Sequence, residues 1–268
     1  MARVVLSVKM DQVGGLQMRW LAEAAAVGEV HVLLWTDALI AAVTGAPPKL
    51  PFAERRYLLE SLRWVAAVEP LDAPHDPETL PPDCAADFWV VCDRSVSEAK
   101  RAFCAGRGIE LRHLPDSALG GFPEIEPPPS TGRPKVIVTG CYDWFHSGHV
   151  RFFEEASEHG ELYVVVGSDA NVGLLKGPGH PLFSQDERRF IVGSVRFVHQ
   201  ALVSTGTGWM DAAPEIERLQ PQIYLVNEDG DKPEKQAFCD EHGLRYVVLR
   251  RLPKEGLTAR QSTDLRGF

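Results

Sequence analysis

The sequence predicts two tandem α/β domains, each a Rossmann-like, doubly wound parallel sheet. Three observations support this fold class: short apolar runs alternate with helical patterns, a proline-rich segment divides the chain, and blocks of the first half recur in the second. The chain has 268 residues, which is enough for two ordinary domains. Its 44% hydrophobic and 24% charged residues are typical of a folded protein with a buried core.

The proline-rich segment, FPEIEPPPSTGRPK, contains five prolines and separates the two stretches that are rich in apolar runs. Proline fixes φ and favours extended backbone, so this segment is expected to be a stiff linker. The predicted organisation is a first domain over residues 1–122, a linker over residues 123–134 and a second domain over residues 135–268.

The internal repeat is clearest in one block. ERRYLLESLRWV, which begins at Glu54, recurs in the second half as ERRFIVGSVRFV from Glu187, with six of twelve positions identical. EVHVLLWTD and DFWVVCD in the first half also match ELYVVVGSD and QIYLVNE in the second, in the same order. Ordered matches at a nearly constant distance indicate a duplicated domain.

Near-continuous apolar runs in the second half predict parallel strands that are buried on both faces. These runs are KVIVTG from Lys135, LYVVVGSD from Leu162, ALV from Ala201, IYLVN from Ile223 and YVVLR from Tyr246. A helix is expected between the second and third strands, with a capping box formed by Ser184 and Glu187 at its start. The apolar residues that share one face of this expected helix are Phe190, Ile191, Phe197 and Val198.

Charge and composition exclude several classes. The formal net charge of -9, from 28 basic and 37 acidic residues, disfavours a broad nucleic-acid surface or an anionic-membrane binder. No apolar run reaches the roughly 18 residues of a membrane span, and no signal-peptide pattern is present, so a cytoplasmic protein is expected. The five cysteines form no CxxC pair, so reduced thiols are expected rather than disulfides or a thiolate zinc site.

The segment VTGCYDWFHSGH carries the strongest chemical signal. A strand is expected to end at Gly140 and a helix to open near His146, which places His146 and His149 in the first turn with both rings on one side. A helix N-terminus at a sheet edge attracts anions, so two imidazoles there predict a phosphate site. Gly148 leaves room for close approach to the backbone. Asp143 is expected either to orient His146 or to cap the helix.

These residues resemble the signature of the HxGH-motif nucleotidyltransferase superfamily, especially its cytidylyltransferase-like branch. That branch includes glycerol-3-phosphate, choline-phosphate and ethanolamine-phosphate cytidylyltransferases and the adenylyltransferase domain of ADP-heptose synthesis. The resemblance covers nearly all of residues 135–266. Its further segments are GSD from Gly167, LKGPG around Lys176, SQDERRFIVGSVRFV, and RLPKEGLTARQSTDLR near the end.

The resemblance implies three catalytic residues: His146 and His149, which contact the phosphates of a nucleoside triphosphate, and Lys176, which faces the phosphate of the acceptor. It implies Mg²⁺ that arrives with the triphosphate and no metal ligands from the protein. The arginine of the late motif maps onto Arg251 or Arg260, because extra residues precede Ser-Thr in this chain. The residues implied for nucleotide binding are Gly140, Cys141, Asp143, Gly148, Asn227, Glu228, Arg251, Arg260, Ser262 and Thr263.

The first half has lost this motif. Gly14 and Gln17 stand at the repeat positions of His146 and His149, and no Ser-Thr pair follows a basic residue at the end of the first half. The first domain is therefore predicted to be a degenerate, non-catalytic copy. Tandem halves resemble ethanolamine-phosphate cytidylyltransferase, in which the active copy comes first. Related enzymes are commonly dimers, so the halves are expected to form an intramolecular pseudo-dimer, with further oligomerisation left open.

The resemblance implies transfer of a nucleoside monophosphate, CMP by preference, to a small phosphorylated alcohol or sugar with release of pyrophosphate. GCYD, KGP and STDL are most similar to cytidylyltransferases, but adenylyltransferases share most of these features, so ATP stays open as the donor. A regulatory protein that binds nucleotide without turnover is another alternative, because one half has already lost its site. An oxidoreductase with a dinucleotide cofactor is disfavoured, since no GxGxxG follows either first strand.

Overall fold

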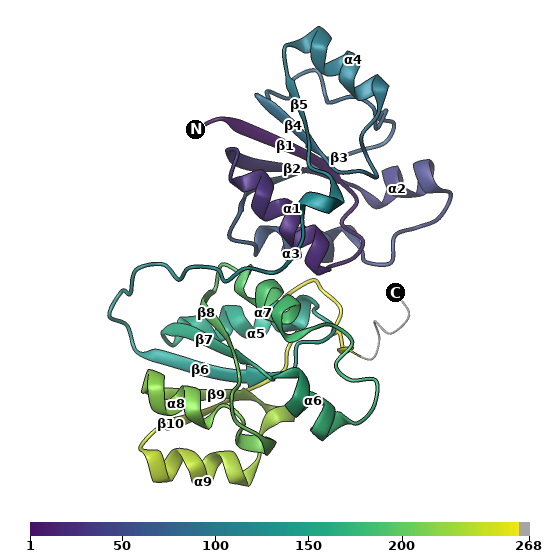
Figure 1. The fold of residues 1–268 in the computed structure, drawn as a ribbon. Coiled ribbons are helices and arrows are strands. Elements are labelled where there is room, and N and C mark those ends of the chain that lie inside the picture. Colours follow the sequence, from purple (N-terminus) through teal and green to yellow (C-terminus); the bar gives the residue numbers. More distant parts are fainter. Residues whose placement is uncertain (263–268) are drawn as a thin grey trace. The chain divides into compact units, whose positions relative to one another are not determined.

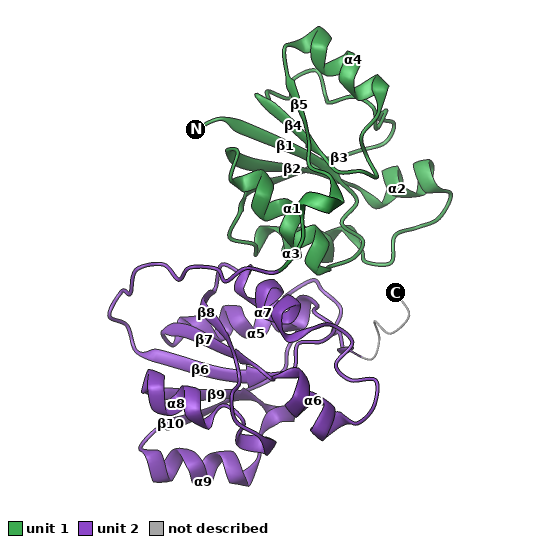
Figure 2. Cartoon of the chain, in the orientation of Figure 1, with its two compact units in different colours: residues 1–121, 268 green, residues 122–267 purple. Residues whose placement is uncertain are grey.

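The computed structural model of the chain describes residues 1–262. It contains two compact units, the first of residues 1–121 and the second from Phe122 onward (Figure 2). Each unit is a five-stranded sheet flanked by helices (Figure 1), which confirms the predicted fold class. None of the helices among the described residues is long and apolar enough to cross a membrane.

Unit 2 holds the HxGH segment and has five parallel strands. Its elements are β6 (Lys135–Gly140), α5 (Ser147–Glu158), β7 (Glu161–Val166), α6 (Asp169–Lys176), α7 (Gln185–Gly193), β8 (Val198–Val203), α8 (Ala213–Leu219), β9 (Ile223–Asn227), α9 (Pro233–His242) and β10 (Arg245–Leu249). The strand order is β10-β9-β6-β7-β8. Helices α5 and α7 lie on one face of the sheet, and α8 and α9 lie on the other (Figure 1). The order changes direction at β6, which creates a crevice at the carboxyl ends of β6 and β9.

The strands of unit 2 form because helices cover their apolar side chains from both faces. All six residues of β7 are buried, the near-continuous pattern of a parallel sheet between two helical layers. Serine caps begin two of the helices: Ser168 accepts the backbone N–H of Asn171, and Ser184 accepts that of Glu187. The second cap confirms the predicted start of α7.

Unit 1 has the same topology. When the strands of each unit are numbered along the chain, both sheets have the order 3-2-1-4-5, so the first strand of each unit is central. Its elements are β1 (Arg3–Val8), α1 (Gly15–Ala25), β2 (Glu29–Trp35), α2 (Asp37–Thr44), α3 (Phe52–Glu60), β3 (Val65–Leu71), β4 (Phe88–Val91), α4 (Glu98–Arg107) and β5 (Glu110–His113). The elements of the two units follow one another in the same order, except that α8 of unit 2 has no counterpart between β3 and β4.

A fully buried arginine makes the same contacts in both units. The Arg188 guanidinium donates to the backbone carbonyls of Phe183, Cys141 and Gly167 and to the Asp169 carboxylate. The Arg55 guanidinium donates to the carbonyls of Leu50, Lys9 and Trp35 and to the Asp37 carboxylate. Each partner in unit 2 stands at the repeat position of the corresponding partner in unit 1. A duplicated domain would give this pattern, although the duplication itself stays a prediction.

The helix expected to extend through Val198 is shorter than the sequence predicts. Helix α7 ends at Gly193, and Val198 is the first residue of β8. A turn intervenes, in which the backbone N–H groups of Val195 and Val198 donate to the carbonyls of Val192 and Val195. The apolar residues beyond the turn reach the core from a strand, so helical spacing alone could not place the boundary.

Residues 122–134 of the proline-rich segment form no helix or strand, as expected of a linker, but they pack along unit 2. The Phe122 ring lies against the Phe190 ring of α7, with centroids 5.9 Å apart. Farther along, the Ser130 and Thr131 hydroxyls donate to the Glu161 carboxylate at the start of β7. The segment is therefore extended and also anchored to the domain that follows it.

Candidate active site

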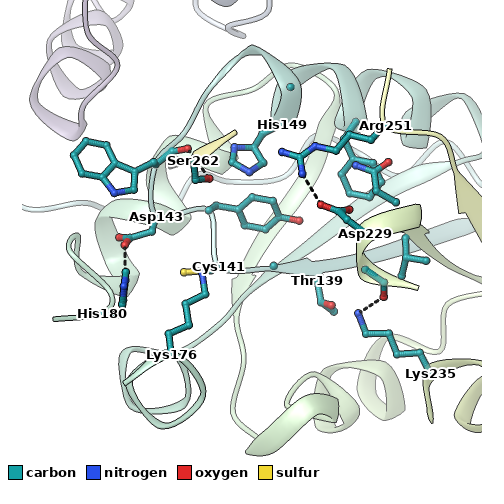
Figure 3. Close-up of a pocket in the computed structure, with 18 residues that line it drawn as sticks. Thr139, Cys141, Asp143, His149, Lys176, His180, Asp229, Lys235, Arg251 and Ser262 are labelled. Atoms are coloured by element: carbon teal, nitrogen blue, oxygen red, sulfur yellow. Dashed lines mark hydrogen bonds and ion pairs between the residues drawn. The ribbon is translucent and has the colours of Figure 1, made fainter. Parts of the chain in front are cut away.

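A cavity of about 270 Å³ opens at the carboxyl end of the unit 2 sheet, where the strand order changes direction. Its walls come from the loop after β6, the start of α5, the end of α6, the segment after β9 and the chain beyond β10 (Figure 3). A second cavity of about 200 Å³ adjoins it. The predicted residues that line the first cavity are Gly140, Cys141, Asp143, Gly148, His149, Lys176, Asn227, Arg251 and Ser262. Glu228 and Arg260 line the second, and Thr263 falls outside the described residues.

The two histidines lie together at the start of α5, but the prediction that both belong to the first helical turn is wrong for His146, which precedes the helix with extended backbone. Their rings stack with centroids 4.0 Å apart and planes 25° apart. His146 is buried and caps the helix, because its Nδ1 accepts the backbone N–H of Gly148 at 3.1 Å. His149 lines the cavity, and His146 lies behind it in the stack. Contact of His146 with phosphate therefore stays a prediction.

His149 is held in a neutral state. Burial lowers its pKa well below the ordinary value for histidine, and the nearby His146, Arg251 and Lys176 lower it further. Tyr142 meets the ring edge-on at 5.3 Å, and the His149 Nδ1 has no hydrogen-bond partner among the described residues. At neutral pH this imidazole offers one N–H donor to an anion in a region of positive potential.

Asp143 does not cap α5, so one of the two roles predicted for it is wrong. The cap position must immediately precede Ser147, and His146 occupies it. The Asp143 carboxylate instead accepts the backbone N–H groups of Leu182 and Phe183 at 2.9 and 3.0 Å. It thereby fixes the chain that leads into α7, next to His180, which lines the cavity.

Lys176 is the last residue of α6, and its exposed side chain extends toward Cys141 (Figure 3). Gly177 and Gly179 follow with φ of 85° and 81°, backbone conformations that residues with side chains rarely adopt. The turn that they form ends α6 at the cavity. Lys176 is therefore the cation that the structure brings to the site from α6.

Of the two arginines considered for the late motif, Arg251 is the one that lines the cavity with His149 (Figure 3). Its guanidinium donates to the Asp229 carboxylate at 2.6 Å and to the backbone carbonyl of Arg260 at 3.1 Å. Ser262 also lines the cavity, and its hydroxyl donates to the Trp144 carbonyl at 3.5 Å. The late segment thus returns to the mouth of the HxGH helix.

Asn227 and Glu228 have different surroundings at the end of β9. Asn227 lines both cavities, and its Oδ1 is buried without a hydrogen-bond partner among the described residues. The Glu228 carboxylate accepts the backbone N–H of Arg251 at 3.2 Å. Asn227 is therefore available to a ligand, whereas Glu228 positions the late segment.

Two glycines are required by the rings beside them. A Cβ atom on Gly140 would lie 2.7 Å from the Tyr142 ring, and one on Gly148 would lie 2.9 Å from the His146 ring. Both separations are too short for a normal contact. Any side chain at these positions would displace a ring of the site, in addition to blocking the ligand approach predicted for Gly148.

Sequence reasoning did not select Tyr142 and Lys235, although both line the cavity. Tyr142 has a φ of 55°, burial raises its pKa, and its hydroxyl has no partner among the described residues. The Lys235 ammonium donates to the Gly230 carbonyl at 3.1 Å, and burial lowers its pKa. The repeat carried a usable signal for Lys235, because Lys100 stands at the same repeat position and lines the equivalent cavity of unit 1.

Unit 1 keeps the scaffold contacts of this site. Asp11 accepts the backbone N–H groups of Lys49 and Leu50, as Asp143 does for its own segment. Asp93 accepts the backbone N–H of Asp116, as Glu228 does for Arg251. The positions that differ are those at the helix start and at the cavity: Gly14, Leu16, Gln17, Cys92 and Asp116 replace His146, Gly148, His149, Asn227 and Arg251. The two units therefore share these scaffold contacts and differ at these five positions.

The doubly wound sheet, the HxGH helix start at its switch point and the cations that converge there define an HxGH-type nucleotidyltransferase domain. The family model described as cytidylyltransferase-like matches residues 137–247, which lie within unit 2. The chain belongs to the cytidylyltransferase-like family of nucleotidyltransferases.

Two curated relatives show how far the similarity extends. FAD synthase of Aciduliprofundum boonei is 35% identical over 136 residues, which cover 50% of this chain and 84% of that protein. The bifunctional protein HldE of Campylobacter concisus is 36% identical over 138 residues, but the match spans only 28% of that longer protein. A solved structure of a lipopolysaccharide core biosynthesis protein from Thermoplasma volcanium is 24% identical, covers 46% of this chain and all of its own, and has a TM-score of 0.39.

Proposed function

We propose that unit 2 transfers a nucleoside monophosphate from a Mg²⁺-bound nucleoside triphosphate to a small phosphorylated alcohol or sugar and releases pyrophosphate. The observation that carries the proposal is the contrast between the units. Unit 1 keeps the scaffold contacts of Asp143 and Glu228 through Asp11 and Asp93. His149 and Arg251, which face the cavity, have no equivalent there.

The chemistry requires positioning and charge stabilisation. A phosphate oxygen of the acceptor attacks the α-phosphorus in line, the bond to the pyrophosphate oxygen breaks, and negative charge develops on the α-phosphate oxygens and the leaving group. Neutral His149 donates an N–H, while Arg251 and the N-terminal backbone of α5 supply fixed positive potential. Lys176 reaches the cavity from α6 and is assigned to the acceptor phosphate.

Mg²⁺ is part of the nucleotide substrate in this proposal. Within residues 1–262, no group of three His, Cys, Asp or Glu side chains is placed to hold a metal ion, and Asp229 at the cavity is paired with Arg251. Mg²⁺ binds triphosphate oxygens and water with few protein ligands. This donor set fits an ion that enters with the triphosphate and neutralises its charge.

CTP is the favoured donor, because GCYD, KGP and STDL are most similar to cytidylyltransferases. ATP is the second candidate, since relatives are named FAD synthase and FAD contains adenine. Base choice depends on contacts that residue types alone do not specify, so the donor is decided by experiment.

The test is pyrophosphate release by the full chain with Mg²⁺, using CTP, ATP, GTP and UTP in turn. Each nucleotide is paired with a panel of phosphorylated alcohols, sugar phosphates and FMN. We expect pyrophosphate and one nucleotidylated product with CTP. Release with ATP alone would make the protein an adenylyltransferase. Nucleotide binding in a thermal shift assay without pyrophosphate from any pair would overturn the proposed turnover and favour a regulatory protein.

Lys176→Ala is expected to raise the KM for the acceptor about 10- to 100-fold, the value of one lost charged hydrogen bond, while the KM for the nucleotide changes little. Steady-state kinetics with each substrate varied separately will measure both. Lys232→Ala provides the matched control, because Lys232 is an exposed lysine of the same unit that does not belong to the cavity wall. An equal effect of Lys176→Ala on both KM values would remove the acceptor assignment.

Nucleotide binding is expected to be linked to proton uptake. The pKa of His149 lies well below its ordinary value in the empty site, and a bound triphosphate favours the protonated ring and raises that pKa. Protons are therefore taken up between the two pKa values, so affinity increases as pH falls, by at most tenfold per pH unit for one proton. Calorimetry near pH 6 in two buffers of different ionisation heat measures the uptake. His149→Gln should remove this contribution, and unchanged uptake in that variant would contradict the linkage.

A further inference from the structure

Unit 1 contains a larger cavity than the candidate active site. It measures about 610 Å³, within the usual range for small-molecule sites, and its walls come from unit 1 alone. It lies at the carboxyl ends of β1, β2 and β4, and Ser7, Trp35 and Val91 line it there. The repeat places it where unit 2 has its candidate active site, so the loss of the HxGH residues did not close the pocket.

Tryptophans supply the aromatic part of the walls of this cavity. Three tryptophans line it, and they stand where unit 2 has Phe152, Gly167 and Tyr224. The tryptophans are Trp20, Trp35 and Trp89. The indole N–H of Trp35 donates to the Ser7 hydroxyl at 2.8 Å, which fixes that ring at the end of β1. Trp35 is partly exposed, whereas Trp20 and Trp89 are buried, so the Trp35 indole supplies most of the flat apolar surface open to a planar ligand.

The groups that suit a triphosphate are absent from the equivalent positions. Gln17 replaces His149, and Leu16 brings a side chain where Gly148 leaves the backbone open. Asp116 stands at the repeat position of Arg251. The imidazole and the guanidinium that line the unit 2 cavity therefore have no counterparts at these repeat positions in unit 1.

The charges that remain free at this cavity are positive. The Asp11 carboxylate is occupied by the backbone N–H groups of Lys49 and Leu50, and Glu78 accepts from the Lys100 ammonium at 3.3 Å. The exposed side chains of Lys9 and Arg94 also line the cavity, and neither has a hydrogen-bond or ion-pair partner among the described residues. Arg94 stands where unit 2 has the acidic Asp229.

We propose that unit 1 binds a planar aromatic ligand with a single anionic group in this cavity. The aromatic part packs against the tryptophans, and the anionic group lies at the rim near Lys9 and Arg94. This site is separate from the nucleotidyl-transfer site proposed for unit 2. Its ligand differs from a nucleoside triphosphate in both charge and the extent of its apolar surface.

The test compares two fluorescent probes that differ by one anionic group. The probes are 8-anilinonaphthalene-1-sulfonate, which joins a planar naphthalene ring to one sulfonate, and N-phenyl-1-naphthylamine, its uncharged counterpart. We expect saturable binding of the sulfonate to the native full chain with one site, and weaker binding of the amine. Absence of saturable sulfonate binding would overturn the proposal.

Matched variants assign the site to unit 1. Gln17→Trp narrows the unit 1 cavity, and His149→Trp narrows the equivalent cavity in unit 2. The proposal requires that Gln17→Trp weakens sulfonate binding and that His149→Trp leaves it unchanged. The reverse pattern would place the probe in unit 2 and exclude the unit 1 site. This readout does not depend on turnover, so it stands apart from the test of the proposed function.

A second set of variants tests the anionic group without filling the cavity. Lys9→Glu combined with Arg94→Glu should weaken sulfonate binding about tenfold and leave amine binding unchanged, because both residues are exposed and act through charge. Arg101→Glu is the control, since Arg101 is an exposed cation of α4 outside the cavity wall. An equal loss of both probes in the double variant, or an equal effect of the control, would refute the assigned role of the rim cations.

Discussion

His149→Gln is expected to lower kcat about 100- to 1,000-fold, the effect of removing one donor that stabilises developing charge. The substitution copies the repeat, because Gln17 occupies this position in unit 1. The ring lines the cavity and packs against Tyr142 at 5.3 Å. The side chain of His149 is not the helix cap, since His146 fills that place, so α5 should keep its start. Pyrophosphate release measures the loss, and a thermal melt checks that the fold is retained.

The matched control for this prediction is Gln17→His. It restores an imidazole to unit 1, but Leu16 and Asp116 still differ from their counterparts in unit 2. The double variant Gln17→His with His149→Gln should therefore be no more active than His149→Gln alone. Normal turnover of the single variant His149→Gln would remove His149 from the catalytic assignment. A tenfold or larger loss in Gln17→His alone would instead give unit 1 a part in the reaction.

The sequence predicted the scaffold well because its signals are local. The apolar run from Lys135 to Gly140 is β6 with the same bounds, and the HxGH segment begins a helix at the adjacent Ser147. A few consecutive residues are enough to show that a strand is buried on both faces, or that two side chains share one helical turn. These features therefore appear in the sequence before any tertiary contact is known.

The assignment of roles within the site was less predictable, because it depends on segments that are distant in sequence. Asp143 is polar and close to the helix start, yet its carboxylate is taken by the backbone of Leu182 and Phe183. Tyr142 joins the site through a φ of 55° that its residue type does not suggest. Arg251 could be preferred over Arg260 only when the path of the late segment was known.

Arg188→Leu is expected to destabilise unit 2 by about 3–5 kcal/mol, a typical effect of breaking a buried charged network. Arg188 has no exposed side-chain surface, and its guanidinium joins three backbone carbonyls to the Asp169 carboxylate. Leucine can satisfy none of these acceptors. Arg188→Lys should also destabilise the unit, because an ammonium cannot reproduce the fork geometry of the guanidinium.

Arg55→Leu is the matched variant in unit 1, because Arg55 makes the equivalent four contacts and is also fully buried. Hydrogen exchange measured on peptides from β6 and β7, and separately from β1 and β2, reports the stability of each unit. Each substitution should accelerate exchange mainly in its own unit, since neither arginine faces a cavity where chemistry is proposed. Arg188→Leu should reduce pyrophosphate release to the extent that it unfolds the Cys141 loop. Arg55→Leu should leave the rate of pyrophosphate release unchanged for molecules in which unit 2 is folded. If Arg188→Leu exchanged hydrogen at the wild-type rate and yet lost turnover, Arg188 would act on the substrate. The purely structural role assigned to this arginine would then be wrong.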